Sequence, residues 1–357
     1  APRGRLARGP PGPQARKAER RSRCAVAVEP LPRGFRLGAA VCSYGFSMLA
    51  PNSWRPRAAT TSRRAAPKHR RRGFEPQGEL ARPLRLADGS AVAAVIRQPS
   101  SLRLEVRIPI KCTAKDKAAM REQVVRMLRL GRGGDAAARH FAAASPDLAA
   151  QGPVGRLFRS PSLFEDLVKT FTLCNCGWSR SISMNEALCR EVGGGAFPSP
   201  EELCQVTALR LRRSCGVGYR AERILRLAKA VAKGAIDLGA FERAASAAEA
   251  ERLCSEVFGL GPFGVANALQ LLGHYEQIAA DSETARHLRQ ARGQRSCSLE
   301  NVRTKAAQTY APYAPLQFMR YWTELWRTYE DRMGGRACDV DPERYRLATA
   351  AHMAVPR

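Results

Sequence analysis

The sequence predicts an α+β fold, in which a small antiparallel β-containing domain precedes a mainly α-helical domain. Residues 91–95 and 102–108 alternate in polarity or run apolar, with turn residues between them, which is typical of antiparallel strands. From about residue 114, apolar side chains recur every three to four positions, the period of an α-helix. The chain of 357 residues is long enough for one large domain or two ordinary ones.

Helices are predicted through most of the chain after Ser162. Apolar faces recur before and after a glycine-rich turn at residues 259–264, and the last strong one covers residues 316–329. The residues that define these faces are Phe164, Leu167, Val168, Phe171, Leu203, Leu209, Leu211, Ile224, Leu225, Leu227, Ala228, Val231, Ala266, Leu269, Leu271, Leu272, Tyr321, Trp322 and Trp326.

Composition divides the chain into four predicted parts. The first residues are too rich in Arg, Pro, Ala and Gly for packed structure, and we expect the folded part to begin near Phe35. The parts are a basic leader over residues 1–33, an N-terminal α/β domain over 34–155 with a basic insertion at 57–79, a helical domain over 156–335, and a tail over 336–357.

The net charge of +27 indicates a polyanionic partner. A basic leader could account for such an excess, but residues 1–80 carry only +14 of it. The remaining +13 belongs to the part expected to fold, so we predict binding to nucleic acid. No apolar run approaches the ~20 residues of a membrane span, so no membrane partner is expected.

The leader leaves the compartment open. Its Arg-rich, acid-poor composition suits an organelle transit peptide and equally a disordered arm that attracts DNA. Residues 68–72 could be a nuclear signal or a solvated loop. Nucleus, chloroplast and mitochondrion are therefore all alternatives.

The eleven cysteines are scattered and form no CxxC pair. The closest two, Cys174 and Cys176, have a spacing that is poor for a zinc or iron–sulfur site. A disulfide framework is not expected at this chain length. The pattern predicts a reducing compartment, mostly buried thiols and no metal ligands.

A glycine-rich turn and an aspartate carry the chemistry. Gly259, Gly261 and Gly264 let the backbone turn and leave amides bare at the start of a helix, where a phosphate oxygen binds well. Such a turn alone is most often a simple connector. However, Asp281 follows Asn267 by fourteen residues and stands at the start of another predicted helix. It could be the N-cap of that helix, a catalytic carboxylate, or both.

This succession of glycine hairpin, V-A-N (Val265 to Asn267), apolar helix and loop aspartate resembles the helix-hairpin-helix base-excision DNA glycosylases. The resemblance covers roughly residues 34–335 and implies that the hairpin, with Val265, grips the DNA backbone. It implies that Asp281 faces the sugar of a flipped nucleotide and stabilises the cation formed as the N-glycosidic bond breaks. V-C-S-Y-G and L-C-N-C-G-W-S-R are similar to a plant and algal branch.

Four further residues match the 8-oxoguanine glycosylases. Asn175 and Arg180 fall where those enzymes fill the gap and read the orphaned cytosine, and Tyr219 and Arg220 fall at their wedge tyrosine and second cytosine-reading arginine. An aromatic wedge and two guanidiniums suit an opened duplex. The alternative is that Asn175 is a turn residue and that Tyr219 and Arg220 simply begin a surface helix.

The sequence departs from those enzymes at their nucleophilic lysine. No lysine occurs between Lys233 and Lys305, so the resemblance shifts to the monofunctional, alkyladenine-type members, which hydrolyse the bond with the aspartate alone. Glu283 stands where relatives have histidine. The resemblance implies no cofactor, since the iron–sulfur cysteines of other members are missing, apart from a monovalent cation that the hairpin backbone could hold.

The resemblance also places a base pocket. Gly45 belongs to a stretch similar to the start of the family's β domain, and Trp178, Phe263 and Phe318 are candidate stacking surfaces, although each aromatic could equally be ordinary core. We therefore expect a monomeric, monofunctional DNA N-glycosylase that removes oxidised guanine or an alkylated purine from damaged duplex DNA. The alternatives are a non-catalytic DNA-binding module and a bifunctional glycosylase/lyase using Lys169 or Lys305.

Overall fold

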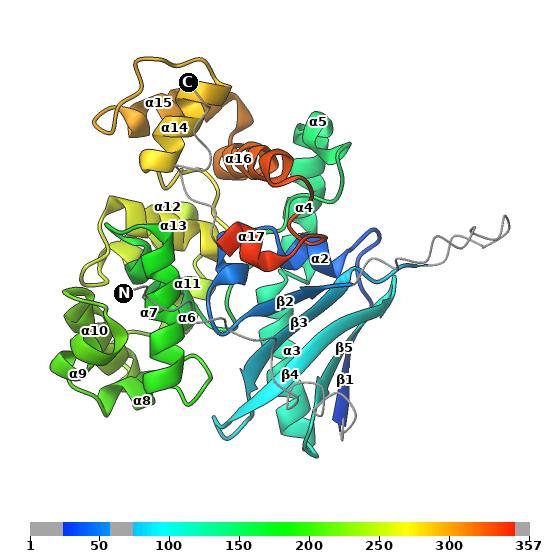
Figure 1. Cartoon of the computed structure of the whole chain (residues 1–357), viewed down its shortest axis with the longest axis vertical. Coiled ribbons are helices and arrows are strands. Elements are labelled where there is room, and N and C mark those ends of the chain that lie inside the picture. The colour runs from blue at the N-terminus through cyan, green and yellow to red at the C-terminus, as the bar shows by residue number, and fades with distance from the viewer. Residues whose placement is uncertain (1–23, 58–73, 347–357) are drawn as a thin grey trace, which may run out of the picture.

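The computed structural model describes residues 24–57 and 74–346, and Figure 1 shows their arrangement. A five-stranded sheet lies beside two groups of helices. The strands are β1 (Cys24–Val28), β2 (Ser53–Pro56), β3 (Gly78–Arg85), β4 (Ala91–Ser100) and β5 (Arg103–Ile108). They are ordered β1-β5-β4-β3-β2, and every neighbouring pair is antiparallel.

The longer helices are α3 (Ala114–Met127), α4 (Arg132–Ala144), α6 (Leu163–Leu173), α7 (Trp178–Glu191), α9 (Ala208–Cys215), α10 (Arg220–Ala232), α12 (Ala247–Ser255), α13 (Pro262–Leu272), α14 (Ser282–Ala291), α15 (Val302–Tyr310) and α16 (Gln317–Met333). The shorter ones are α2 (Leu37–Val41), η1 (Gly45–Met48), α5 (Pro146–Ala149), α8 (Pro200–Cys204), α11 (Leu238–Glu242), η2 (Ala311–Tyr313) and α17 (Pro342–Arg346). The predicted α+β fold is confirmed. None of the described helices is long and apolar enough to span a bilayer.

Both strands predicted from the sequence are present: β4 is five residues longer than the predicted range 91–95, and β5 is one residue shorter than the predicted range 102–108. Alternate residues of β4 point into the core, where Val92, Ala94 and Ile96 are buried, which is the pattern of a sheet with one covered face. β2 and β3 were not predicted, because Pro56 and Pro83 lie within them and the basic insertion adjoins them.

The prediction that packed structure begins near Phe35 is wrong by about one strand. β1 starts at Cys24, inside the segment assigned to the leader, and buries Val26 and Val28. Its five residues pair with β5, which lies some eighty residues later. That pairing is a long-range contact, and local composition does not reveal it. The basic residues 68–72 and residues 1–23 lie outside the described part.

The cysteine prediction needs one correction. A disulfide joins Cys24 to Cys112, the first residue of β1 and the loop after β5. The antiparallel pairing of the two strands brings these ends together, although 88 positions separate them. Most of the described free thiols are buried, as expected: Cys42, Cys189, Cys215, Cys254, Cys297 and Cys338.

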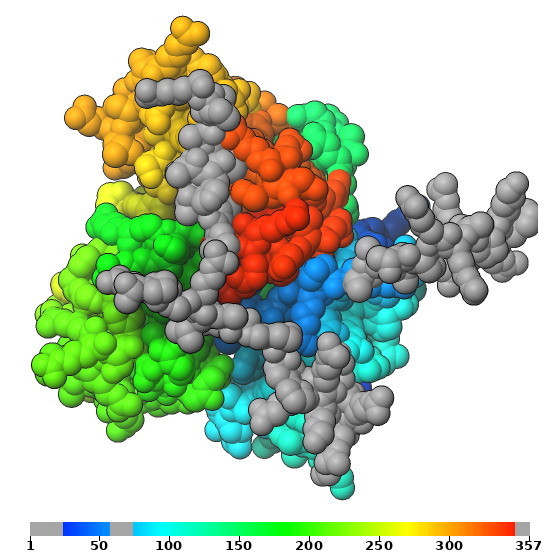
Figure 2. All heavy atoms as spheres, in the orientation of Figure 1, coloured from blue at the N-terminus to red at the C-terminus, as the bar shows by residue number. Residues whose placement is uncertain are grey.

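Two hydrophobic cores organise the molecule. The first joins the sheet, α2, α3 and α4 to the C-terminal helices α14, α15, α16 and α17, so both ends of the described chain contribute to it. The second lies among α6, α7, α10, α12 and α13. Figure 2 shows the C-terminal helices, coloured red, packed against the N-terminal segment, coloured blue. The indole of Trp54 fixes this contact by donating to the carbonyl of Cys338, at 2.9 Å.

A buried ion triad ties the sheet to the second helical group. Glu165 on α6 accepts from Arg82 on β3 at 3.0 Å and from Lys169 on α6 at 2.7 Å, and all three side chains are buried. Burial alone would raise the pKa of Glu165, but the two cations outweigh it and lower that pKa to about 2. The triad therefore holds charge where an unpaired ion would be very unfavourable.

Candidate functional site

A cavity of about 510 Å³ opens at the junction of the two cores. It has the size and mixed character of a site for a small organic group. Its lining includes Asp281 and all four predicted pocket residues, Gly45, Trp178, Phe263 and Phe318. Seven helical elements contribute lining residues, together with adjoining loops, from η1 near the start of the described chain to α17 near its end. The structure therefore brings together residues that the sequence separates by more than two hundred positions.

Aromatic rings form much of the wall. Phe318 and Trp322 lie on successive turns of α16 and stack with ring centroids 6.0 Å apart, and Trp326 continues the stack at 5.5 Å from Trp322. Tyr44 meets Trp322 edge to face at 4.8 Å. Gly45 faces Trp178 so closely that a Cβ atom would lie 3.4 Å from the indole. Flat walls of this kind suit a planar heteroaromatic ring.

Asp281 both caps a helix and lines the cavity. Its Oδ1 accepts from the amide of Thr284 at 2.9 Å and from the Thr284 hydroxyl at 3.1 Å, while the Asp281 amide donates back to that hydroxyl, also at 3.1 Å. This capping box fixes the carboxylate at the start of α14. Both hydrogen bonds from Thr284 to the carboxylate go to Oδ1, and Asp281 lines the cavity at the same time.

The surroundings of Asp281 disfavour its charge. The carboxylate is accessible from the cavity, but protein atoms crowd it on its other sides, and this desolvation raises its pKa above the ordinary value. The bonds from Thr284 act in the opposite direction, and nearby Glu283 adds to the rise. A carboxylate in this position can stabilise a cation that forms beside it in the cavity.

Glu283 is a second carboxylate on the same wall. The Arg286 guanidinium holds it through contacts of 2.9 Å to both oxygens, and the Tyr329 hydroxyl donates to it at 2.8 Å. Arg286 does not line the cavity, whereas Tyr329 lines it beside Glu283. Glu283 is thus held by two side chains, whereas the side chain that holds the Asp281 carboxylate is that of Thr284.

The hairpin between α12 and α13 has the predicted backbone features. Gly259 adopts φ +89°, and a Cβ there would lie 2.6 Å from the side chain of Arg223. Gly261 caps α13 without a side chain, so the first amides of this helix have no side-chain cap. Gly264 is buried, and a Cβ there would meet Leu260 at 2.8 Å. Val265 is also buried and so contributes backbone rather than side chain to the surface.

The predicted gap-filling and wedge residues lie together. Asn175 Nδ2 donates to the hydroxyl of Tyr219 at 3.2 Å, and Asn175 adopts φ +51°, which asparagine tolerates well. The Tyr219 side chain is 45 % exposed. The loop that carries Asn175 continues into Gly177 and Trp178, which line the cavity. The pair therefore stands beside the entrance to the aromatic cavity.

The two predicted cytosine-reading arginines differ in setting. Arg180 is exposed on the first turn of α7. Arg220 is buried, and its guanidinium donates to the carbonyls of Phe171 at 3.0 Å and of Cys174. It thereby fixes the end of α6 and the loop that carries Asn175. In this structure Arg220 supports the loop and presents no free donor at the surface.

Neither lysine considered as a nucleophile lines the cavity. Lys169 is completely buried in its pair with Glu165, and Lys305 on α15 donates to Ser296 at 3.1 Å. The described cavity wall contains no lysine at all.

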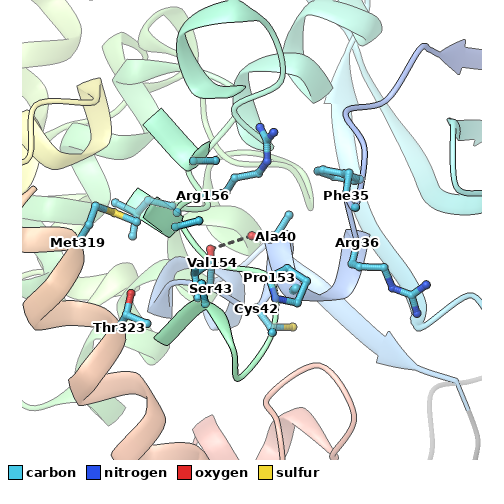
Figure 3. Close-up of a pocket in the computed structure, with 18 of the residues that line it drawn as sticks. Phe35, Arg36, Ala40, Cys42, Ser43, Pro153, Val154, Arg156, Met319 and Thr323 are labelled. Atoms are coloured by element: carbon cyan, nitrogen blue, oxygen red, sulfur yellow. Dashed lines mark hydrogen bonds between the residues drawn. The ribbon is translucent and has the colours of Figure 1, made fainter. Parts of the chain in front are cut away.

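A second cavity of 410 Å³ lies on the other side of Trp322 and Trp326, which line both. Figure 3 shows its apolar residues around the centre, with Arg36 and Arg156 extending away from them. Ser43 there donates to the carbonyl of Ala40 at 2.8 Å. It contains none of the predicted site residues, so the cavity with Asp281 is the candidate active site.

Several cavity residues were not predicted as site residues. Tyr345 lies in the segment assigned to the tail, and Tyr44 sits next to Gly45, where it accepts a hydrogen bond from the Asn267 amide at 2.8 Å. Asn267 and Tyr44 stand in motifs that the sequence had already singled out, and this was a usable signal. Tyr345 gave none, because its role depends on where α17 packs.

Comparisons with known proteins concern the fold as a whole. No family model matches the sequence, and no curated protein matches it. Among solved structures, the chain is similar to a 3-methyladenine DNA glycosylase from Archaeoglobus fulgidus (TM-score 0.59, 19% identity), over 84% of this chain and 97% of the other. It is also similar to an 8-oxoguanine glycosylase/lyase from Clostridium acetobutylicum in complex with double-stranded DNA (TM-score 0.50, 14% identity), over 70% of this chain and 88% of the other.

The chain therefore shares its fold with these two DNA glycosylases, in line with the fold that the sequence resemblance implied. Sequence identities below one fifth establish the fold and leave the chemistry to be argued from the site.

Proposed function

We propose that this protein is a monofunctional DNA N-glycosylase that removes a damaged purine from duplex DNA. The observation that carries the proposal is the position of Asp281, which begins α14 and lines an aromatic cavity large enough for a purine. The neighbouring hairpin and the exposed Tyr219 supply a surface for the opened duplex.

The proposed reaction follows from the charges. A nucleotide flips into the cavity and its base lies among the rings of Trp178, Phe263 and Phe318. As the N-glycosidic bond lengthens, positive charge develops on the sugar, and the Asp281 carboxylate stabilises it. The same carboxylate orients water for attack at C1′ and takes up its proton. The products are the free base and an abasic site.

Hydrolysis is favoured over lyase chemistry because no lysine of residues 24–57 and 74–346 lines the cavity. A lyase needs an amine that attacks C1′ and forms a Schiff base. Lys169 is fully buried and ion-paired, and Lys305 lies on α15, outside the cavity wall. Borohydride reduction in the presence of damaged DNA should therefore trap no covalent complex, and a trapped complex would establish the bifunctional alternative.

Two lesion classes fit the site. Asn175, Tyr219 and Arg180 favour a guanine-derived lesion opposite cytosine, as in the 8-oxoguanine enzymes. The aromatic, carboxylate-lined cavity favours alkylated purines, since their positive charge interacts well with both ring faces and carboxylates. An alkylated purine also needs less help as a leaving group.

The deciding experiment is base release from duplexes that carry one defined lesion opposite each of the four bases. Wild-type protein should release one lesion class, and Asp281→Asn should release none while still binding the duplex. Release by both proteins would move catalysis away from Asp281. Duplex binding without release of any lesion would favour the non-catalytic DNA-binding module.

A further inference from the structure

We propose that the exposed face of α10 is a second DNA-binding surface, which extends the contact with one strand beyond the hairpin. This inference rests on the proposed function only in assuming that duplex DNA is the partner. The face consists of Arg223, Arg226, Lys229 and Lys233, and is called the α10 basic face below.

The helix geometry places these cations together. At ~100° per residue, Arg226, Lys229 and Lys233 fall within an arc of about 60°, and Arg223 lies about 60° beyond Arg226, so the four span about 120°. Arg220, at the start of the same helix, points the other way and is buried. Arg226, Lys229 and Lys233 are exposed, as expected for the side of α10 turned away from the second core.

None of the four cations pairs with an acid. The only acidic residue on α10, Glu222, is already paired with Arg212, and no ion pair of the described chain includes a member of the α10 basic face. Elsewhere on the described surface many arginines have acidic partners within 3 Å, as Arg252 has in Glu256. The four charges are therefore available to phosphates.

Aromatic side chains fix two of these arginines against the DNA-binding elements. The Arg223 guanidinium lies 4.7 Å from the ring centre of Tyr219, and that of Arg226 lies 4.0 Å from the ring centre of Phe258. Phe258 precedes the hairpin glycine Gly259 and is 53 % exposed. Stacking holds each guanidinium in place, so less side-chain entropy is lost when it binds a phosphate.

The α10 basic face starts at the wedge and leads away from it. From Arg223 to Lys233 the helix rises about 15 Å at ~1.5 Å per residue. This equals the axial length of roughly four base pairs at ~3.4 Å each. A strand gripped at Gly259 and opened at Tyr219 would therefore follow α10 over several further phosphates.

A conventional role for lysines at a helix end is to stabilise the helix dipole, and Lys229 and Lys233 occupy the last turn. That role does not explain Arg223 and Arg226, which lie earlier in the helix and stack on exposed rings. It predicts an effect on stability alone, so the two roles are separable.

The test compares two triple variants that remove the same charge. Arg226→Gln/Lys229→Gln/Lys233→Gln alters α10, and Lys115→Gln/Lys117→Gln/Arg121→Gln alters α3 beside the sheet (Figure 1). Binding to a duplex with a tetrahydrofuran abasic analogue is followed by fluorescence anisotropy from about 50 to 300 mM KCl. The plot of log K against log[KCl] has a negative slope. Its magnitude should decrease by about 0.9 per lost phosphate contact, thus by about 2 to 3 for the α10 variant.

The α3 variant should keep nearly the wild-type slope. Equal changes in both variants, or no change in either, would overturn the proposal. If thermal unfolding shows that the triple variant is destabilised, the single variant Arg226→Gln replaces it. The magnitude of its salt slope should decrease by about 0.9. If wild-type protein releases no base while the α10 slope changes as expected, the glycosylase proposal fails and this inference stands.

Duplex length gives an independent readout. Two duplexes are compared. Each has only about three base pairs on one side of the analogue, and the short side of one duplex is the long side of the other. Wild-type protein should bind one of them more weakly, and the α10 triple variant should show no further loss for that duplex. A loss of the same size in the variant would show that another surface contacts this part of the DNA.

Discussion

At the scale of single residues, the proposed catalytic role of Asp281 is separable from its role as the N-cap of α14. Asparagine is as good an N-cap as aspartate, whereas alanine loses the cap at a cost of about 1 kcal/mol. Asp281→Asn should therefore reduce single-turnover base release by roughly 10²- to 10⁴-fold with no loss of thermal stability. Asp281→Ala should lose both activity and about 1 kcal/mol of unfolding free energy. Equal destabilisation by the two variants would mean that the charge of Asp281 matters for folding.

The pH dependence of base release should report the raised pKa of Asp281. The carboxylate must be ionised to stabilise the sugar cation, so the rate should rise with pH through a pKa above that of an ordinary aspartate. Because the folded-state pKa is raised, the contribution of this group to stability is present at low pH and is lost as pH rises through that pKa. At neutral pH, Asp281→Asn should then unfold at a temperature equal to or above that of the wild type. A rate that is flat with pH across this range would contradict the assignment.

At the scale of elements, the Arg82–Glu165–Lys169 triad joins the sheet to α6. Removing one partner of a buried ion pair leaves an uncompensated charge, so Lys169→Met should cost on the order of 3–5 kcal/mol. Lys305 is only half-buried and belongs to no ion pair of the described residues, so it gives a control, and Lys305→Met should change stability by about 0.5 kcal/mol or less. Urea unfolding measures both. If Lys169→Met were as stable as the wild type and lost activity, Lys169 would belong to the chemistry.

The triad also sets a pH window for stability. Glu165 has a lowered pKa of about 2, so its stabilising contribution is complete above the ordinary pKa of a glutamate and is lost as pH falls towards about 2. Glu165→Gln should therefore flatten the acid limb of the stability profile. An unchanged acid limb would place the acid sensitivity in other groups.

At the scale of the whole molecule, the first core is closed by the C-terminal helices. Trp54 donates to the carbonyl of Cys338, and Tyr345 lines the cavity. Deletion of residues 336–357 should therefore lower the unfolding temperature and base release together, as the indole loses its acceptor and the cavity loses part of its wall. Calorimetry and base release on the same preparation test this. Deletion of residues 347–357 is the matched control, because every contact named here lies before residue 347.

Several features of the fold and the site could be predicted from sequence because they are local. Helical periodicity, the glycine turn and the capping pattern at Asp281 each occupy a few consecutive residues. The choice of Gly45, Trp178, Phe263 and Phe318 depended on the family resemblance, and all four line the cavity with Asp281. By contrast, Arg220 was expected at the surface and is buried, because its guanidinium donates to the carbonyls at the end of α6.

The sequence by itself determined the fold class, the hairpin, the catalytic candidate and the lack of a lysine between residues 233 and 305. Only the tertiary structure decided that β1 pairs with β5, that Cys24 meets Cys112, and that Tyr345 joins the cavity wall. It also decided which cations of the basic chain are free, as on α10, and which are paired. The physical reason is that periodicity and backbone preferences act over one or two turns, whereas pairing, burial and charge compensation depend on segments brought together by the two cores.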